Sequence, residues 1–371
     1  MKIFLTGDNH IGLAKKNKDI YENRINVFEN MVNEANNEKC DLFVISGDLF
    51  EDNNSHKKDL KKVLDLLREF NNTVVILPGN HDYYDAESDL WSEFNTLQPK
   101  YNNVLLLKEY KEYKVKCGDN DVSLLPALCK SNHSKKGENN IGWISDLDFK
   151  DDCSFRIGIA HGVVEGEAID TEGEYFSMSR KELDKMPIDL WLIGHTHVPF
   201  PNDLTDKLIS VNDRIFNAGT HVQTDVNCNT EGNCFIIEIA DDKTIKAKKY
   251  ISGNLFYKRI KINIKPGELK QSLESELKKY DKNTIIDLIL EGTLENNEYE
   301  ERKNIIEDVL DSFNENSTYS TVNISRFITK EYINSNYVET SFSAKLLTAL
   351  LDNPKETQLM DELLQTLKEG K

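Results

Sequence analysis

The sequence predicts an α/β protein in which two central sheets with helices outside them form a four-layer α/β/β/α sandwich. Two observations support this fold class. Strand-like and helix-like segments alternate at the start of the chain, which is typical of a parallel βαβ core. Later strand-like segments are joined by short turns with fewer helices between them, so a second sheet is expected to pack face to face on the first. A small α/β unit and a helical tail are expected to follow.

The predicted strands of the sandwich are short, and several are apolar at nearly every position. Such runs are typical of strands that are buried on both faces. They comprise residues 2–6, 42–46, 74–77, 104–107, 122–125, 156–160, 190–193, 235–239 and 246–251. Apolar side chains recur at helical spacing in residues 20–37 and 57–70, which predicts two amphipathic helices. These helices separate the first three strands.

The composition shifts after Gly253, and three regions are expected. Residues 1–254 form the large domain. Residues 255–330 form a small α/β unit, because strand-like and helix-like segments alternate over 256–264, 268–280, 284–291, 300–313 and 319–324. Residues 331–371 form a helical C-terminal segment, which Asn353-Pro354 divides into two leucine-rich helices.

Composition narrows the class of protein. The chain has 371 residues, of which 39% are hydrophobic and 30% charged, which suits a soluble globular protein. No apolar run approaches the roughly 20 residues that a membrane-spanning helix needs. The N-terminus runs directly into a strand without the charged region or cleavage site of a signal peptide, so a cytoplasmic location is the default expectation.

Cysteine spacing and net charge bear on metal and nucleic-acid binding. The six cysteines show no CxxC spacing, so we expect reduced thiols and not a disulfide framework or a zinc site. The net charge of −18 argues against strong unaided binding of nucleic acid, which usually requires a basic surface. Two bound divalent cations would, however, add positive charge where a phosphate must lie.

Seven polar residues in five short motifs indicate the chemistry. They are Asp8 and His10 in Gly7-Asp8-Asn9-His10, Asp48 in Gly47-Asp48, Asn80 in Gly79-Asn80-His81-Asp82, His161 in Ala160-His161-Gly162, and His195 and His197 in Gly194-His195-Thr196-His197. Four of the five motifs follow a β-rich run, which places them on loops at one edge of a sheet. Carboxylate, carboxamide and imidazole groups bind manganese, iron or zinc. The pattern predicts a two-metal hydrolase.

Each motif alone is weak evidence, because a single buried histidine is usually a hydrogen-bonded core residue. Five of the eight histidines, however, fall within the motifs, beside glycines that allow backbone and substrate to approach closely. The combination favours a bound pair of metal ions over coincidence.

This ordered set resembles the calcineurin-like metallophosphoesterases over about residues 1–240, with every ligand position filled. The resemblance implies that Asp8, His10 and His197 bind one metal, that Asn80, His161 and His195 bind the other, and that Asp48 bridges the two. Ions held about 3.5–4 Å apart would activate a water and bind the phosphoryl oxygens of an in-line displacement. A neutral ligand such as Asn80 leaves the ions strongly Lewis acidic.

Two further residues are expected to be catalytic. His81 is similar to the family's histidine that stabilises the transition state or protonates the leaving oxygen. Asp82 would orient His81 by accepting its other N–H, or else would cap the next helix. Surface or structural roles are expected for His56, His133 and His221, although His221 follows a strand-like run and could line the cleft.

The residues around these motifs also resemble the SbcD-type DNA repair nucleases, in Thr6–Gly12, Ser46–Phe50 and Pro78–Asp82. That resemblance implies Mn²⁺-dependent 3′→5′ exonuclease action on DNA, with endonuclease action as well, in double-strand break repair and recombination. Residues 255–330 would be the capping domain. The C-terminal helices would dock on an SbcC-type ABC ATPase, or else pack on their own domain. Dimers are common in that family, but the sequence shows no decisive apolar patch for one.

One position departs from some of those relatives, and two other functions stay open. Glu51 stands where some relatives have a histidine, three residues after the bridging aspartate, although bacterial members carry an acidic residue there. The difference concerns how the DNA strand end is positioned. A small-molecule or cyclic-nucleotide phosphodiesterase would use the same seven ligands. A non-catalytic scaffold subunit of an ATPase complex is the other alternative, and the complete ligand set argues against it.

Overall fold

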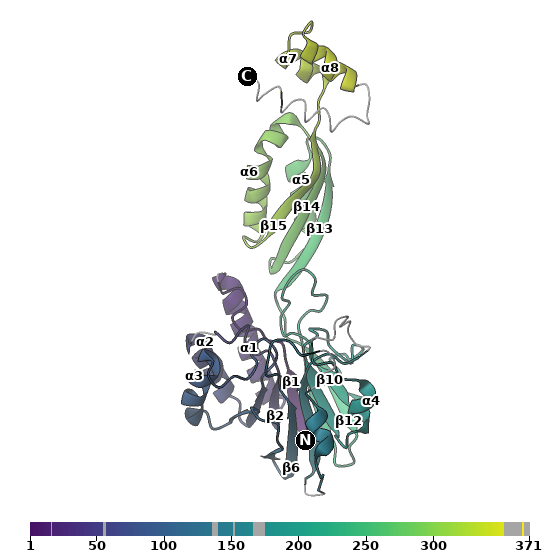
Figure 1. Cartoon of the computed structure of the whole chain (residues 1–371). Helices are drawn as coiled ribbons and strands as arrows, with labels where there is room; N and C mark the ends of the chain where they lie inside the picture. Colours follow the sequence, from purple (N-terminus) through teal and green to yellow (C-terminus); the bar gives the residue numbers. More distant parts are fainter. Residues whose placement is uncertain are drawn as a thin grey trace. The chain divides into compact units, whose positions relative to one another are not determined.

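The chain forms two compact units, Met1–Leu255 and Phe256–Lys371 (Figure 1). A computed structural model describes residues 1–15, 17–54, 57–135, 140–150, 153–165, 175–351 and 366. The change of unit lies one residue beyond the boundary that the composition shift suggested. The second C-terminal helix expected after Asn353-Pro354 falls outside the described residues, apart from residue 366.

The first unit contains a seven-stranded sheet of order β4-β3-β2-β1-β11-β12-β9. Four parallel strands come from the N-terminal part of the chain: β1 (Lys2–Thr6), β2 (Leu42–Ser46), β3 (Thr73–Leu77) and β4 (Val104–Leu106). The other three are β11 (Asn233–Ile239), β12 (Ile245–Ile251) and β9 (Ile209–Val211). Strand β11 lies antiparallel to β1, with Ile237 opposite Ile3.

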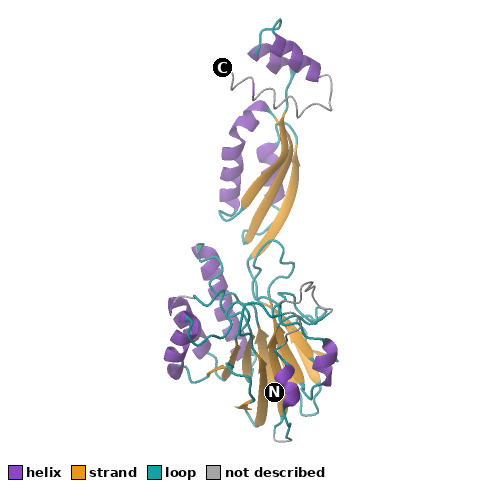
Figure 2. Cartoon of the chain, viewed as in Figure 1, coloured by secondary structure: helices purple, strands orange, loops and turns teal. Residues whose placement is uncertain are grey.

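Helices α1 (Lys18–Asn37), α2 (Lys57–Arg68) and α3 (Asp89–Leu97), with a short 3₁₀ turn η1 (Gln98–Lys100), pack on one face of this sheet (Figure 2). Their apolar stripes meet the strands, and the rings of Phe4 and Phe43 stack at 5.1 Å within this layer. Asn17 caps α1 and Ser88 caps α3, each by accepting a backbone N–H of the first turn. The sequence predicted α1 and α2 but not α3.

A five-stranded sheet of order β10-β8-β7-β6-β5 forms the second half of this unit. Its strands are β5 (Tyr113–Cys117), β6 (Asn120–Ala127), β7 (Phe155–His161), β8 (Leu190–Gly194) and β10 (Ile215–Asn217). Its outer face packs on the 3₁₀ turn η2 (Gly142–Asp146) and helix α4 (Arg180–Lys185), through side chains such as Ile144 and Leu183.

The two sheets pack face to face through a buried layer of mainly apolar side chains. Leu5 and Val44 from the first sheet and Ile157 and Leu192 from the second belong to one buried cluster between them. Helices cover the outer face of each sheet, so the predicted four-layer α/β/β/α sandwich is confirmed.

The second unit is built on a three-stranded parallel sheet of order β13-β14-β15, with β13 at Phe256–Ile264, β14 at Thr284–Leu294 and β15 at Thr318–Arg326. Helices α5 (Leu269–Leu277) and α6 (Asn296–Phe313) share its apolar core. Two charged pairs, Arg259–Asp287 and Lys261–Glu291, join β13 to β14, each at 2.6 Å.

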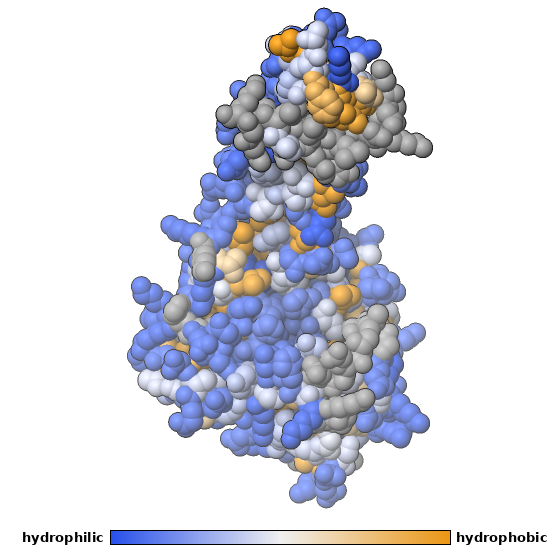
Figure 3. Space-filling model, turned by 45° about the horizontal axis from the view of Figure 1, so that its top comes forward, coloured by the Kyte–Doolittle hydropathy of each residue, from blue (hydrophilic) through white to orange (hydrophobic). Residues whose placement is uncertain are grey.

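Helices α7 (Lys330–Asn336) and α8 (Phe342–Leu351) form a separate small cluster around Ile333 and Leu347. Val338, between the two helices, is 72% exposed, and Phe342, the first residue of α8, is 79% exposed. Most of the surface seen in Figure 3 is hydrophilic, with apolar patches at the C-terminal helical end. Among the described residues, no helix has the length and apolar character needed to span a bilayer.

Candidate metal centre

The structure brings all seven predicted ligands together at one edge of the sandwich. Asp8 and His10 follow β1, Asp48 follows β2, Asn80 follows β3, His161 ends β7, and His195 and His197 follow β8. The carboxyl ends of parallel strands meet at the same edge of a sheet, which explains why residues so far apart in the chain converge. Their assignment as metal ligands stays a prediction.

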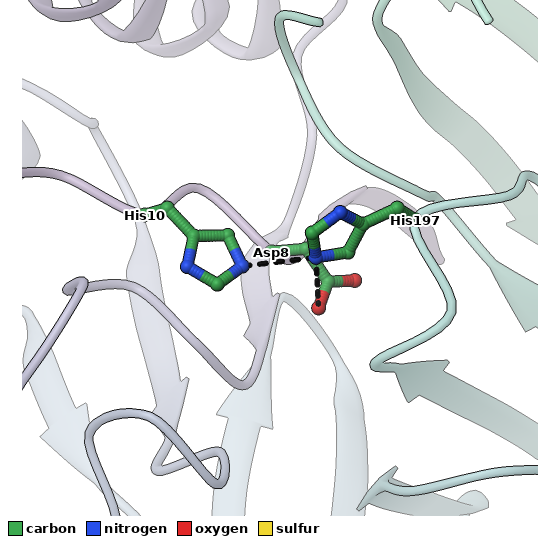
Figure 4. A group of neighbouring side chains, drawn as sticks. All are labelled: Asp8, His10 and His197. Carbon is green, nitrogen blue, oxygen red and sulfur yellow. Dashed lines mark hydrogen bonds and ion pairs between the residues drawn. The ribbon is translucent and has the colours of Figure 1, made fainter. Parts of the chain in front are cut away.

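One group of donor atoms comes from Asp8, His10 and His197 (Figure 4). The Nε2 atoms of His10 and His197 lie 2.9 Å apart. His197 Nε2 is 3.8 Å from Asp8 Oδ1, and His10 Nε2 is 3.8 Å from Asp48 Oδ2. Ring nitrogens and carboxylate oxygens that face one another in this way carry lone pairs, which a cation would satisfy together.

A second group surrounds the carboxamide oxygen of Asn80. That oxygen lies 3.0 Å from His161 Nε2 and 2.9 Å from His195 Nδ1. Asp48 Oδ2 is 3.2 Å from His161 Nε2, so the same carboxylate oxygen faces both groups. The donors therefore fit two divalent ions with Asp48 between them. Asp8, His10 and His197 would hold one ion, and Asn80, His161 and His195 the other.

Burial shapes the protonation of these groups. Burial would raise the pKa of Asp48, but the charge of His161 and its hydrogen bond to the carboxylate outweigh burial and lower the pKa. Burial opposes protonation of His161, yet the charge of Asp48 prevails and raises its pKa to about 9. Burial and the neighbouring His161 lower the pKa of His195 to about 3. His195 is therefore neutral at physiological pH, whereas His161 carries a proton that a metal must displace.

Five of the seven candidate ligands have left-handed backbone conformations. The φ angles are 48° at Asp8, 45° at His10, 49° at Asp48, 114° at His195 and 56° at His197. Such conformations cost non-glycine residues about 1–3 kcal/mol each and persist only where surrounding structure imposes them. The loops are therefore held in place by the packed strands that carry them.

Two motif glycines are required by close approach. A Cβ at Gly47, whose φ is +98°, would lie 1.9 Å from His161 Nδ1. A Cβ at Gly79 would lie 2.1 Å from Asp48 Oδ1. Any larger residue at either position would displace a candidate ligand.

His81 lies beside the metal ligands but is exposed. Its backbone N–H donates to Asp48 Oδ1 at 2.9 Å, and its ring packs edge-on against His10 at 4.7 Å between centroids. Ring atom Nδ1 is 3.1 Å from the carbonyl oxygen of Glu51. This contact leaves Nε2 as the nitrogen available to a substrate.

The expected role of Asp82 requires correction. Its buried carboxylate accepts backbone N–H groups from Gly79 at 2.7 Å and Phe50 at 3.0 Å, whereas His81 Nδ1 bonds to Glu51. Burial, together with the charge of Asp48, raises the pKa of Asp82 to about 7. Because α3 is capped by Ser88, Asp82 does not cap that helix either. Through these two hydrogen bonds, Asp82 links the loop after β3 to the loop after β2.

Three residues near the site lie outside any recognisable sequence motif, so the sequence did not indicate that they are close to it. Asn132 accepts a hydrogen bond from the Asn80 amide at 3.1 Å. The ring of Tyr175 lies 4.8 Å from that of His195, and the exposed His133 lies 5.4 Å from Tyr175. All three come from loops without hydrophobic periodicity.

The histidines outside the motifs have varied surroundings. His221 is fully buried, and its Nε2 lies 3.3 Å from the carbonyl oxygen of Arg24. It is therefore part of the core. Its place after a strand-like run had suggested that it could line the cleft, but it does not. His133 lies at the surface beside Tyr175, and His56 is outside the described residues.

Comparison with known proteins decides the family. Residues 1–199, more than half of the chain, match the calcineurin-like phosphoesterase family. The chain belongs to the calcineurin-like phosphoesterases. The expected superfamily is thereby confirmed, and the family's use of divalent metals agrees with the donor groups described above.

Individual relatives of this phosphoesterase are distant. It is 26% identical to the uncharacterized metallophosphoesterase YhaO of Bacillus subtilis (strain 168) over 178 residues, which are 45% of this chain and 39% of YhaO. It is 30% identical to the double-strand break repair protein mre-11 of Caenorhabditis elegans over 95 residues, 26% of this chain and 12% of that protein. The solved structure of TT1561 from Thermus thermophilus aligns with a TM-score of 0.42 at 10% identity, over 66% of this chain and 97% of that one. The matches with YhaO and mre-11 span well under two thirds of either protein.

Proposed function

We propose that this phosphoesterase is a two-metal DNA nuclease, a Mn²⁺-dependent 3′→5′ exonuclease with endonuclease action as well, which serves double-strand break repair and recombination. The observation that carries the proposal is the complete donor set around Asp48, with His81 beside it, in a chain partly similar to a double-strand break repair protein. The likeness of its motifs to SbcD-type nucleases supports the same substrate.

The candidate residues have distinct roles in this reaction. Two divalent ions, when bound, supply positive charge that activates a water and neutralises the phosphoryl oxygens. The Asp48 carboxylate lies between the two donor groups and holds them in register. His81 protonates the departing 3′ oxygen through Nε2. In the protonated ring Nδ1 also donates, so its contact with the Glu51 carbonyl oxygen orients the proton-bearing nitrogen.

Cleavage of duplex DNA labelled at the 3′ or the 5′ end, with Mn²⁺, tests the proposal. We expect shortening from the 3′ end, its loss in His81→Ala, and Mn²⁺ binding within a few-fold of the wild type in that variant. Absence of DNA cleavage alongside brisk hydrolysis of a small chromogenic phosphodiester would replace the DNA substrate by a small-molecule or cyclic-nucleotide one. Absence of both would favour the scaffold subunit.

The proposal extends to the roles of the three regions of the chain and to its partners. We propose that residues 1–254 hold the nuclease site, that 255–330 form a capping domain, and that 331–371 dock on an SbcC-like ABC-type ATPase in the cytoplasm. The exposed Val338 and Phe342 support docking, and the net charge of −18 favours sharing DNA binding with a partner. Co-purification of the ATPase with the wild type and its loss in Phe342→Ser would support this. Light scattering of the purified chain would test homodimerisation.

A further inference from the structure

Glu51 contacts two of the site's sequence motifs at once, through His10 and His81, and the residue that follows the first of them. Its side chain oxygen Oε2 is 2.9 Å from His10 Nδ1. Its carbonyl oxygen is 3.1 Å from His81 Nδ1, and its backbone N–H donates to the carbonyl oxygen of Ile11 at 3.1 Å. Neither the donor pattern of the motifs nor the metal ligand set predicts these contacts.

The His10 contact determines which ring nitrogen can bind a metal. A neutral imidazole carries one N–H and one lone pair, and the nitrogen that binds a metal must present the lone pair. His10 Nε2 faces His197 Nε2 and Asp48 Oδ2, so Nε2 is the metal-binding nitrogen. Nδ1 must then carry the hydrogen, and Glu51 Oε2 is the acceptor in reach. A carboxylate in this position fixes the tautomer and the orientation of a metal-binding histidine.

The His81 contact acts on the second ring in a similar way. His81 Nδ1 faces a main-chain oxygen, which can only accept a hydrogen bond, so Nδ1 carries a hydrogen in either charge state. Nε2 is then free to exchange a proton with a substrate. The rings of His10 and His81 pack edge-on with their centroids 4.7 Å apart, and Glu51 contacts Nδ1 of each.

We infer that Glu51 is a positioning residue that holds His10 in its metal-binding tautomer through its carboxylate and orients His81 through its carbonyl oxygen. This role rests on the proposed metal site but not on DNA as the substrate.

Two substitutions separate the hydrogen bond from the charge. Glu51→Gln keeps an oxygen that can accept from His10 Nδ1 but removes the negative charge, whereas Glu51→Ala removes both. Glu87→Gln is the matched control, because it removes an exposed carboxylate six positions from His81. All variants are made in the full chain, and thermal unfolding confirms that each one folds.

Titration calorimetry with Mn²⁺ alone measures the effect without any substrate. We expect Glu51→Ala to weaken one of two binding events about 10–100-fold, as loss of a partner of a metal-binding histidine does. The other event, at the Asn80 group, should keep its affinity. Glu51→Gln should stay within a few-fold of the wild type, and Glu87→Gln should match the wild type.

The tautomer itself is observable by ¹⁵N nuclear magnetic resonance of histidine side chains in the Zn²⁺-loaded chain. We expect His10 to bear its hydrogen on Nδ1 in the wild type and in Glu51→Gln, and to lose that slowly exchanging signal in Glu51→Ala. Wild-type Mn²⁺ affinity in Glu51→Ala would overturn the inference. So would a Glu51→Gln variant as impaired as Glu51→Ala, because the carboxylate would then act by its charge or as a ligand. A wild type that binds no Mn²⁺ would overturn the metal site and this role with it.

Discussion

The Nε2 atoms of His10 and His197 lie 2.9 Å apart, although the two residues are 187 positions apart in the chain (Figure 4). At this distance two ring nitrogens must share either a proton or a cation, because two lone pairs facing each other repel. A metal ion must therefore compete with protons for these nitrogens, so the affinity of the site for metal depends on its protonation.

The His161–Asp48 pair predicts that metal binding releases a proton. In the metal-free chain the pKa of His161 is raised to about 9, so the ring is protonated near pH 7. It must lose this proton to bind an ion, and affinity should rise about tenfold per pH unit up to about pH 9 and then level off. Calorimetry in buffers of different ionisation enthalpy measures the release, and we expect about one proton per chain near pH 7. An enthalpy that does not depend on the buffer would contradict this.

Gly47→Ala should disrupt the second donor group. Its Cβ would lie 1.9 Å from the His161 ring, and the backbone conformation at φ +98° is unfavourable for alanine. We expect a loss of about 2–4 kcal/mol in the free energy of unfolding, from overpacking and backbone strain together. Urea denaturation measures this loss.

Gly118→Ala is the control for Gly47→Ala. Gly118 also has a positive φ, +60°, but nothing lies within 4 Å of the position of its Cβ. It should lose only the backbone contribution of about 1–2 kcal/mol and keep full metal affinity. Equal losses in the two variants would mean that the contact with His161 is relieved without cost.

Asn132→Ala should weaken the ion held by Asn80. The Asn132 side chain accepts from the Asn80 amide nitrogen, which turns the Asn80 oxygen towards His161 and His195. Because Asn132 is exposed, we expect a loss of about tenfold or less in affinity, at the low end for partners of metal ligands. Asn132→Asp keeps the acceptor and should bind Mn²⁺ nearly as the wild type does. A larger loss in Asn132→Asp than in Asn132→Ala would contradict this orientation.

His221 should make the stability of the first unit depend on pH. Burial, with the charge of Arg24, holds the pKa of His221 well below its usual value. The unfolded chain binds a proton near pH 6.5 that the folded chain does not, so this contribution is complete above that pH and declines as the pH falls. The slope is up to about 1.4 kcal/mol per pH unit.

Urea denaturation between about pH 5 and pH 7 with a metal chelator present measures this slope. We expect His221→Gln to reduce this slope by up to about 1.4 kcal/mol per pH unit, because His195 and His197, whose pKa values are also lowered, keep their own contributions. The control His133→Gln, which replaces an exposed histidine, should keep the wild-type dependence. The same slope in His221→Gln and the wild type would assign the effect to other groups.

Sequence reasoning predicted the sandwich, and the placement of the seven candidate ligands at one edge of it, because both follow from simple regularities. Apolar runs define buried strands, and the ends of parallel strands converge on one edge, so residues directly after such runs are placed together. Helix α3 was missed, although Ser88 and Trp91 carry cap and core signals, because its nine residues follow a turn-rich stretch. Only strong periodicity over a longer segment would have made it evident.

The finer organisation of the site could not be predicted. The contact between Asn132 and Asn80 joins two loops 52 residues apart and leaves no pattern in the sequence. The left-handed φ of His195 is equally hidden, because a non-glycine residue gives no sign that its neighbours force that conformation. The role of Asp82 was misassigned because the motif shows that Asp82 adjoins His81 but not that its partners are the backbone N–H groups of Gly79 and Phe50.

The insertion of β11 beside β1 has a consequence for how the protein is made. Strand β1 leaves the ribosome well before β11, yet β11, which ends at Ile239, is one of its two neighbours in the sheet. Until that strand emerges, β1 keeps an open edge and the nascent chain contains a half-built sheet. Non-local pairing of this kind slows folding and exposes strands that can aggregate. We therefore expect chains stopped before Ile239 to be insoluble or dependent on chaperones, whereas those that extend through β12 can close the sheet during synthesis.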